Sequence, residues 1–326
     1  MRFSIITPVY NRPQEVRELL ETLAHQRFRD FELVLVEDGS TEPCRHLVDE
    51  FSNLVQIQYH FKAKEGPSPA RNFGFEKARG EYLILFDSDL LVPPDYFERV
   101  TTALATQGWD AFGGPDRAHE SFTDLQKAVN YAMTALLTTG GIRGNKRALA
   151  QYTPRSFNMG LSRKVYETVG GFIDMHPGED IDFSIRIQKS GFRVGFIPDA
   201  FVYHKRRATW SKFWRQVFRF GQKRVELARL HPGQLKLAHL FPLGFLVLTL
   251  ALLPALATGL PGAWIPLSLW TTYLVLIFVD SSRVNRSLWV GLLSVYASLI
   301  QLYAYAFGLI DGLFTSNRKV SFPKTS

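Results

Sequence analysis

The chain has 326 residues, of which 46% are hydrophobic and 21% charged, and its formal net charge is +8. This length suits one large domain plus a further segment, and the overall composition is that of a globular protein. The single cysteine, Cys44, excludes an internal disulfide bond. The N-terminal stretch MRFSIITPVYN is interrupted too early by Asn-Arg-Pro to be a signal peptide. We therefore expect the first 235 residues to stay in the cytoplasm.

The first 90 residues alternate short apolar runs with stretches of helical periodicity. The predicted strands are residues 3–9, 31–36, 55–59 and 82–86. The predicted helices are residues 13–24, a segment marked by Leu47, Val48 and Phe51, and residues 69–78. Strands that alternate with helices predict an α/β fold, in which helices cover both faces of a mostly parallel sheet.

Ligands bind such sheets at the carboxyl ends of the strands, and polar residues stand there at 7–11, 37–40 and 87–89. No G-x-G-x-x-G follows the first strand, which argues against a dinucleotide-binding oxidoreductase. The glycine-rich stretch GGIRG at residues 140–144 follows no predicted strand. We interpret it as a flexible loop rather than a phosphate-binding loop.

The stretch LILFDSDLL places Asp87 and Asp89 two residues apart at the end of an apolar strand. Side chains at this spacing share a side of an extended backbone and can converge on one point. Two converging carboxylates repel each other, and a divalent cation with oxygen ligands, Mg²⁺ or Mn²⁺, would offset that repulsion. The alternative is a loop that uses aspartate for turn chemistry.

Further motifs favour the metal site. They are SIITPVYNR, VEDGST, ARNFGFEKARGEYLILFDSD, GGF and GED, and in this order they span residues 3 to about 204. With these motifs the chain resembles family 2 glycosyltransferases, which are inverting enzymes with the GT-A fold that use nucleotide-activated sugars. No single motif is specific, but their order and spacing together are.

The resemblance implies a site residue by residue. Asp38 of VEDGST would contact the nucleotide base, and Asp89 would bind the metal most directly. Asp87 would contact the ribose or the metal, and His204 would be an additional metal ligand, although a histidine after an apolar strand is often only a core residue. The other residues implied to bind the nucleotide sugar are Thr7, Pro8, Tyr10, Arg71, Asn72 and Glu179.

Asp180, in GED, matches the catalytic base of the family. An acceptor hydroxyl loses its proton as it attacks, so a carboxylate must lie within hydrogen-bond reach of it. Inversion follows from a single in-line displacement, with the base on the face opposite the leaving group. The alternative is that Asp180 only begins a helix, because acidic residues favour the first turn. Both interpretations can hold together.

The C-terminal third contains two long segments without charge, residues 240–279 and 288–310. A membrane-spanning helix needs roughly 20 apolar residues. The first segment is long enough for two spans joined at ATGLPG, and we predict spans at about 240–258, 263–280 and 288–310. Buried helices of a soluble protein are the alternative.

Basic residues cluster directly before the first predicted span. Positive charge beside a span marks the cytoplasmic side, and anionic headgroups or an anionic substrate explain the cluster better than nucleic acid does. If the third segment crosses, however, the basic tail lies on the opposite side. Either that segment does not fully cross or the charge bias is weak. The clustered residues are Lys205, Arg206, Arg207, Lys212, Arg215, Arg219, Lys223 and Arg224, and those of the tail are Arg318, Lys319 and Lys324.

Residues 209–230 carry aromatic and basic side chains at helical spacing, which is typical of a helix in the membrane interface. An amphipathic helix packed on the domain is the alternative. Within it, QVFRF resembles the Q-x-x-R-W motif of membrane-embedded polysaccharide synthases, which implies that Arg219 contacts the donor diphosphate. Phe220 replaces the tryptophan, so stacking of the acceptor stays open.

We therefore expect a GT-A domain at residues 1–208, an interfacial helix region at 209–236 and a membrane region at 237–326. The predicted function is transfer of a sugar from a UDP- or GDP-sugar, with Mg²⁺ or Mn²⁺, to a lipid-linked saccharide in the cell envelope. The alternatives are a processive polysaccharide synthase and a non-catalytic membrane scaffold. The residues that would select the sugar, between 113 and 158, follow no pattern that we can interpret.

Overall fold

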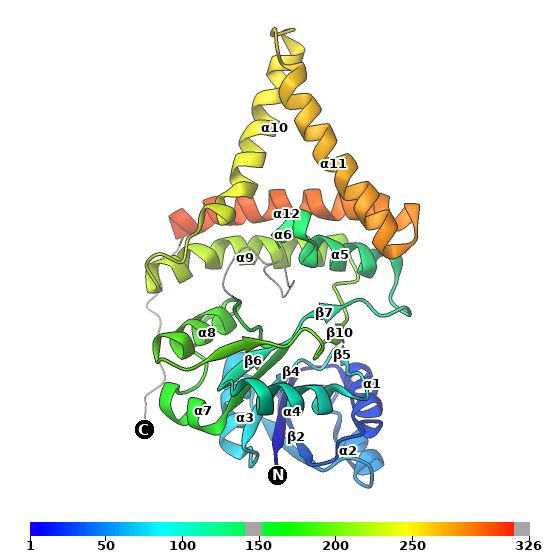
Figure 1. Ribbon diagram of the computed structural model, residues 1–326, viewed down its shortest axis with the longest axis vertical. Coiled ribbons are helices and arrows are strands. Elements are labelled where there is room, and N and C mark those ends of the chain that lie inside the picture. The colour runs from blue at the N-terminus through cyan, green and yellow to red at the C-terminus, as the bar shows by residue number, and fades with distance from the viewer. Residues whose placement is uncertain (141–151, 316–326) are drawn as a thin grey trace. The chain divides into compact units, whose positions relative to one another are not determined.

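The computed structural model of the protein describes residues 1–140 and 152–315, and Figure 1 shows its elements. Residues 141–144 of the predicted glycine-rich loop lie outside the described residues, as do the basic residues of the C-terminal tail. The chain divides into two compact units. Among the described residues, the first unit holds 1–119 and 152–205, and the second holds 120–140 and 206–315.

The first unit is built on a seven-stranded sheet with the strand order β3-β2-β1-β4-β8-β6-β9. The strands β3, β2, β1 and β4 are parallel, β8 is antiparallel to its neighbours β4 and β6, and β9 is parallel to β6. The predicted mostly parallel sheet is thereby confirmed. The bounds are β1 Phe3–Val9, β2 Phe31–Asp38, β3 Ile57–Lys62, β4 Tyr82–Phe86, β6 Ala111–Gly113, β8 Asn158–Ser162 and β9 Val194–Phe196.

Helices cover both faces of this sheet, as the sequence predicts. Successive side chains of a strand point to opposite faces, so Ile5 packs into one core and its neighbour Ile6 into the other. The first core includes residues of α1, α2 and α4, and the second includes residues of α3, α7 and α8. The bounds are α1 Pro13–Ala24, α2 Arg45–Phe51, α3 Pro67–Lys77, α4 Tyr96–Gln107, α7 Arg163–Val169 and α8 Glu179–Lys189.

A second, three-stranded sheet in the same unit joins β5 (Leu90–Leu91), β10 (Val202–His204) and β7 (Asp116–Arg117). His204 pairs with Leu90 in the antiparallel ladder between β10 and β5. Because β5 directly follows the Asp-x-Asp stretch, this small sheet brings a residue from the end of the unit beside residues 87–89.

The second unit is helical, and three of its helices are long and apolar enough to cross a membrane. These candidates are Leu237–Ala257, Trp264–Asn285 and Leu288–Thr315, which agree with the predicted spans. The unit also contains residues 120–140, which the sequence did not assign to it. Its elements are α5 Asp124–Thr134, α6 Leu136–Thr139, α9 Trp210–Leu230, η1 Leu237–Leu240, α10 Phe241–Ala257, α11 Trp264–Asn285 and α12 Leu288–Thr315.

The helices α9 and α12 run side by side in the same direction (Figure 1). Near the start of both helices, the ring of Trp210 in α9 packs edge-to-face against that of Tyr296 in α12. Near their ends, Val225 of α9 lies against Gly312 of α12. Glycine permits the close approach, because a Cβ at Gly308 would lie 1.9 Å from the backbone oxygen of Phe218. Half of the apolar window of α12 is buried, whereas only 17% and 11% are buried in the windows of α10 and α11.

Candidate functional site

The candidate site of the first unit lies where β4 ends. Phe86 is buried and anchors the strand, and the next residues lead into β5 with Asp87 and Asp89 half-buried. Together with His204 of β10 they offer three ligand atoms that all lie within 4.8 Å of one another. Carboxylates suit Mg²⁺ and Mn²⁺, and imidazole binds several other first-row metals. The three residues therefore form a group that could hold a divalent cation.

Asp89 also contacts two cationic or potentially cationic side chains. Arg12 Nη1 lies 2.8 Å from Asp89 Oδ2, and His204 Nε2 lies 3.2 Å from Oδ1. Arg12 immediately precedes α1 and follows the carboxyl end of β1. Arg12 was not among the site residues predicted from the sequence, although its place in VYNRP, beside the polar end of the first strand, was the signal that could have identified it.

Arg71 of α3 links Asp87 to the start of α8. Its guanidinium is buried and donates to Asp87 Oδ1 at 2.8 Å and to Glu179 Oε1 at 2.9 Å. Burial alone would raise the pKa of Glu179, but the hydrogen bond from His176 and the charge of Arg71 lower this pKa to about 2. Glu179 is therefore an anion at neutral pH and a fixed partner of Arg71.

Asp180 occupies the first turn of α8, as the sequence predicts. Its Oδ1 accepts the backbone N–H of Ile181 at 2.8 Å and lies 3.7 Å from Arg155 Nη1. Asp180 directly follows Glu179, whose carboxylate is paired with Arg71. The position is compatible with both interpretations, a helix start and a base at the site, and its catalytic role stays a prediction.

Asp38 lies at the carboxyl end of β2 with its carboxylate buried. Both oxygens accept backbone hydrogen bonds, from the N–H of Glu65 at 2.9 Å and of Gly66 at 2.8 Å. Gly66 has a φ of +105° and directly precedes α3. Asp38 therefore positions the start of α3. Lys62 Nζ lies 3.5 Å from its Oδ1, so Oδ2 is the oxygen that keeps a lone pair for a further donor such as a nucleotide base.

The predicted pocket residues of β1 lie at its carboxyl end. Thr7 is buried, and its hydroxyl has no hydrogen-bond partner among the described residues, which leaves a donor and acceptor at this edge of the sheet. Pro8 is half-buried beside it. Tyr10 is exposed, and the ammonium of Lys64 lies 3.7 Å from the centre of its ring. An exposed ring flanked by a cation suits contact with a nucleotide.

Asn72 is engaged elsewhere. Its side chain donates to the carbonyl of Phe172 at 2.9 Å and accepts from the N–H of the same residue at 2.7 Å. A Cβ at Gly171 would lie 2.2 Å from Asn72 Oδ1, so the close approach requires glycine there. Asn72 therefore connects α3 to the GGF motif through these hydrogen bonds. The structure does not bring its amide together with Asp87, Asp89 and His204.

Two further residues near the site, both between 113 and 158, were not predicted from the sequence. Asp116 of β7 is buried, and its Oδ2 lies 3.8 Å from His204 Nδ1. Arg155 lies beside Asp180, as described above. Both approach the site through tertiary contacts that no local pattern encodes. Arg219, by contrast, lies exposed on α9 in the second unit.

Residues 4–170, which make up just over half of the chain, match the Glycosyl transferase family 2 domain. The chain belongs to this family. It is 24% identical over 324 residues to the succinoglycan biosynthesis protein ExoA of Rhizobium meliloti, an alignment that covers 97% of this chain and 96% of ExoA. An uncharacterized glycosyltransferase of Rickettsia bellii is 39% identical over 88 residues, which cover 27% of this chain and only 13% of that protein.

The probable glycosyltransferase YdaM of Bacillus subtilis is 23% identical over 238 residues, and the match covers 68% of this chain and 54% of YdaM. Among solved structures, the chain is similar to the mannosyltransferase PcManGT from Pyrobaculum calidifontis, which was determined in complex with GDP-Man and Mn²⁺. The TM-score is 0.69 at 20% identity, with 97% of this chain and 88% of PcManGT covered. This likeness, with the family match, confirms the predicted GT-A fold.

Proposed function

We propose that this family 2 member is an inverting, metal-dependent glycosyltransferase. In this proposal it moves a sugar from a UDP- or GDP-sugar to a membrane-associated acceptor, with a lipid-linked saccharide as the acceptor class. The observation that carries the proposal is the convergence of Asp87, Asp89 and His204 at the end of β4 within a family 2 domain. The complex of PcManGT with GDP-Man and Mn²⁺ supports the nature of the donor and the ion.

The described residues fit the metal site and the base that such a reaction needs. A divalent ion held by Asp87, Asp89 and His204 would neutralise the charge that develops on the leaving nucleoside diphosphate. Asp180 would accept the proton of the attacking hydroxyl. The buried bridge from Asp87 through Arg71 to Glu179 fixes the first turn of α8, and with it Asp180, relative to the end of β4.

The experiment is a screen of UDP- and GDP-sugars with the purified full-length protein in detergent, with and without Mn²⁺. We expect turnover of one donor class, dependent on the metal. Asp180→Asn should abolish turnover and keep nucleotide binding, whereas the control Asp174→Asn changes an exposed acid outside α8 and should retain turnover. Turnover of Asp180→Asn at the normal rate would exclude Asp180 as the base. Binding of no sugar nucleotide by the wild type would contradict the proposed function.

The length of the product separates this proposal from a processive synthase. The name of ExoA connects that relative with succinoglycan biosynthesis, which supports a role in polysaccharide assembly. We expect this chain to add one sugar to each acceptor, and a long polymer from the purified protein would contradict that expectation.

We further propose that α10 and α11 cross the membrane while α9 and α12 lie at its cytoplasmic surface. The helices α9 and α12 are paired in parallel, so α12 cannot cross unless α9 is buried with it. Lys212, Arg215 and Arg219 are exposed on α9, and each would cost about 3 kcal/mol at the centre of a bilayer. With α12 at the surface, its end at Thr315 lies on the same side as the basic cluster, and the conflict with the positive-inside rule disappears.

Single cysteines test this topology with a membrane-impermeant maleimide. Leu288→Cys and Phe314→Cys mark the two ends of α12, and Leu260→Cys marks the turn between α10 and α11; all three positions are exposed. Cys44 should not interfere, because burial and its hydrogen bond to Glu37 raise the pKa of its thiol. We expect positions 288 and 314 to react from one side and position 260 from the other. Reaction of 288 and 314 from opposite sides would show that α12 crosses.

A further inference from the structure

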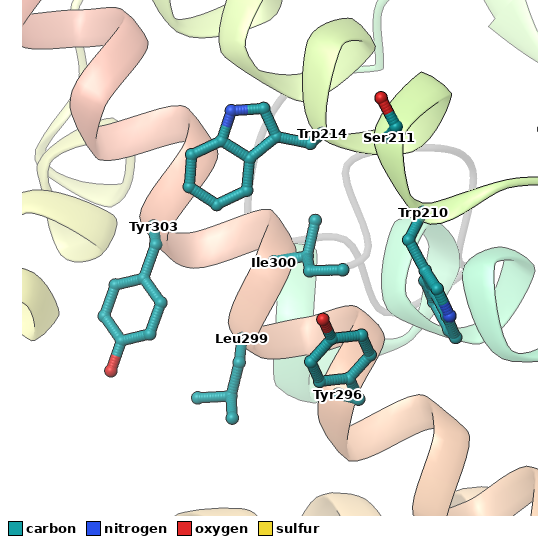
Figure 2. Close-up of a pocket in the computed structure, with 7 residues that line it drawn as sticks. All are labelled: Trp210, Ser211, Trp214, Tyr296, Leu299, Ile300 and Tyr303. Atoms are coloured by element: carbon teal, nitrogen blue, oxygen red, sulfur yellow. The ribbon is translucent and has the colours of Figure 1, made fainter.

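The second unit contains a cavity of about 390 Å³ between α9 and α12, which we call the aromatic groove. Figure 2 shows Trp210 and Trp214 of α9 and Tyr296 and Tyr303 of α12 around Ile300. No residue of the candidate site described above lines this cavity. Its volume lies within the range of roughly 300–1,000 Å³ that is typical of small-molecule sites.

The aromatic groove presents its rings to the surroundings instead of filling a core. Tyr296 is 52% exposed and Trp214 is 36% exposed. Tryptophan and tyrosine combine an apolar ring with a polar tip, and they are enriched where a protein meets the boundary between lipid and water. The groove is therefore suited to an amphiphile.

One end of the groove is cationic. Ser211 lines the groove, and its hydroxyl oxygen accepts a hydrogen bond from Arg215 Nη2 at 3.1 Å. Lys212 is exposed next to Ser211. In the part of the chain that the structure describes, no carboxylate forms an ion pair with Arg215 or Lys212. Arg215, which is hydrogen-bonded to the groove-lining Ser211, and the exposed Lys212 next to Ser211 in the sequence complement a phosphate group.

The other end of the groove leads to a candidate membrane span. The hydroxyl of Tyr303 lies 3.1 Å from Thr249 Oγ1 of α10, and its ring is 5.8 Å from that of Phe245. An apolar chain that leaves the groove past Tyr303 therefore meets α10 at once, where a bilayer would surround the helix. The groove thus joins a phosphate-attracting end to a lipid-facing end.

We propose that the aromatic groove binds a lipid phosphate with a single apolar chain, with its phosphate at Arg215 and Lys212 and its chain along Trp214 and Tyr303. The cavity volume of about 390 Å³ favours such a lipid over a two-chain phospholipid. The proposal rests on the proposed function in one respect, because it identifies this lipid as the carrier of the acceptor saccharide.

The test measures binding of farnesyl phosphate to the full-length protein in detergent by isothermal titration calorimetry. Trp214→Ala and Arg215→Gln should each weaken binding about tenfold, the loss expected for about 1.4 kcal/mol. Trp264→Ala and Arg207→Gln are matched controls, since both positions are exposed outside the groove, and they should bind normally. Circular dichroism verifies that each variant keeps its helical content.

Two further ligands identify the chemistry. Farnesol, which lacks the phosphate, should bind at least tenfold more weakly than farnesyl phosphate, and dioleoyl phosphatidic acid should compete poorly. Equal competition by the two-chain lipid would overturn the proposal and make the groove a site for ordinary membrane lipid. Unchanged affinity in both groove variants would overturn it as well.

These outcomes are separable from the failure of the proposed function. If the wild type turns over no sugar nucleotide but the groove variants still bind farnesyl phosphate more weakly than the wild type does, the glycosyltransferase proposal fails and the lipid phosphate site stands. If turnover is observed and the groove variants bind farnesyl phosphate normally, the lipid phosphate site is refuted and the glycosyltransferase proposal stands.

Discussion

Replacing Arg71 by methionine removes the cation between two carboxylates. Arg71 is 4% exposed and Glu179 3% exposed, so methionine fills similar space and leaves the buried Glu179 charge without the guanidinium, while the hydrogen bond from His176 remains. Removing one partner of a buried ion pair costs about 3–5 kcal/mol. The side chain of Asp87 is 30% exposed and can be hydrated, so most of this cost falls on Glu179. For a domain of this size we expect the melting temperature to fall by about 10 °C.

The cost should depend on pH in a defined direction. In the wild type the pKa of Glu179 is about 2, below its ordinary value of 4.5, so its stabilising contribution is present above pH 4.5 and is lost as the pH falls toward 2. Without the charge of Arg71, the effect of burial on Glu179 is less opposed, so the pKa of Glu179 lies higher than in the wild type. The folded variant then takes up a proton at higher pH, which removes the buried charge. The difference in stability between the two proteins should therefore narrow as the pH falls from 7 to 4.

Thermal melting of the full-length protein in detergent at pH 7 and pH 4 measures this difference. Arg79→Met is the matched control, because Arg79 is exposed at the end of the same segment, and it should melt like the wild type at both values. If Arg71→Met melts like the control at pH 7, the bridge does not hold α8. If its deficit is the same at both pH values, the buried charge of Glu179 is not the cause of the deficit.

Three other substitutions test the site and the helix pair. Asp89→Ala should weaken nucleotide binding only when Mn²⁺ is present, and equal titration curves for variant and wild type would remove Asp89 from the metal site. Arg12→Ala should tighten Mn²⁺ binding without nucleotide by about fivefold, because Arg12 and the ion compete for Asp89 and a partly exposed ion pair is worth up to about 1 kcal/mol. Electron paramagnetic resonance measures the free ion. Weaker Mn²⁺ binding by the variant would refute this competition for Asp89. Gly308→Ala places a Cβ 1.9 Å from the Phe218 carbonyl oxygen and should destabilise by about 1–3 kcal/mol. Gly244→Ala, with nothing within 4 Å, should not lower the melting temperature.

The fold was largely predictable because its elements carry local patterns. Continuous apolar runs identified β1, β2 and β4, since strands buried on both faces need few polar residues. The candidate spans were predictable for a similar reason, because charge is excluded from the hydrocarbon over a long stretch. The polar residues at the strand ends followed from the geometry of parallel sheets, which brings their carboxyl ends to one edge.

The partners of the site residues were not predictable in the same way. The pairing of Arg12 with Asp89 joins residues 77 positions apart, and that of Arg71 with Glu179 joins residues 108 apart. Asn72 has the right place in its motif, but only the close approach of Gly171 shows that its amide is used to hold a loop. A motif fixes where the backbone of a residue lies, whereas the direction of its side chain depends on neighbours that are distant in sequence.

The parallel pairing of α9 and α12 constrains how the chain must be connected. Two parallel helices cannot be joined by a tight turn, because the chain has to return along the whole first helix before the second can begin. The α9 helix has 21 residues and is about 32 Å long at 1.5 Å per residue. A linker that replaces α10 and α11 would therefore need at least about 10 extended residues to reach the start of α12. The hairpin of α10 and α11 is thus also the return connection of this pair, and truncating it to obtain a soluble protein would separate two helices that the glycines bring together.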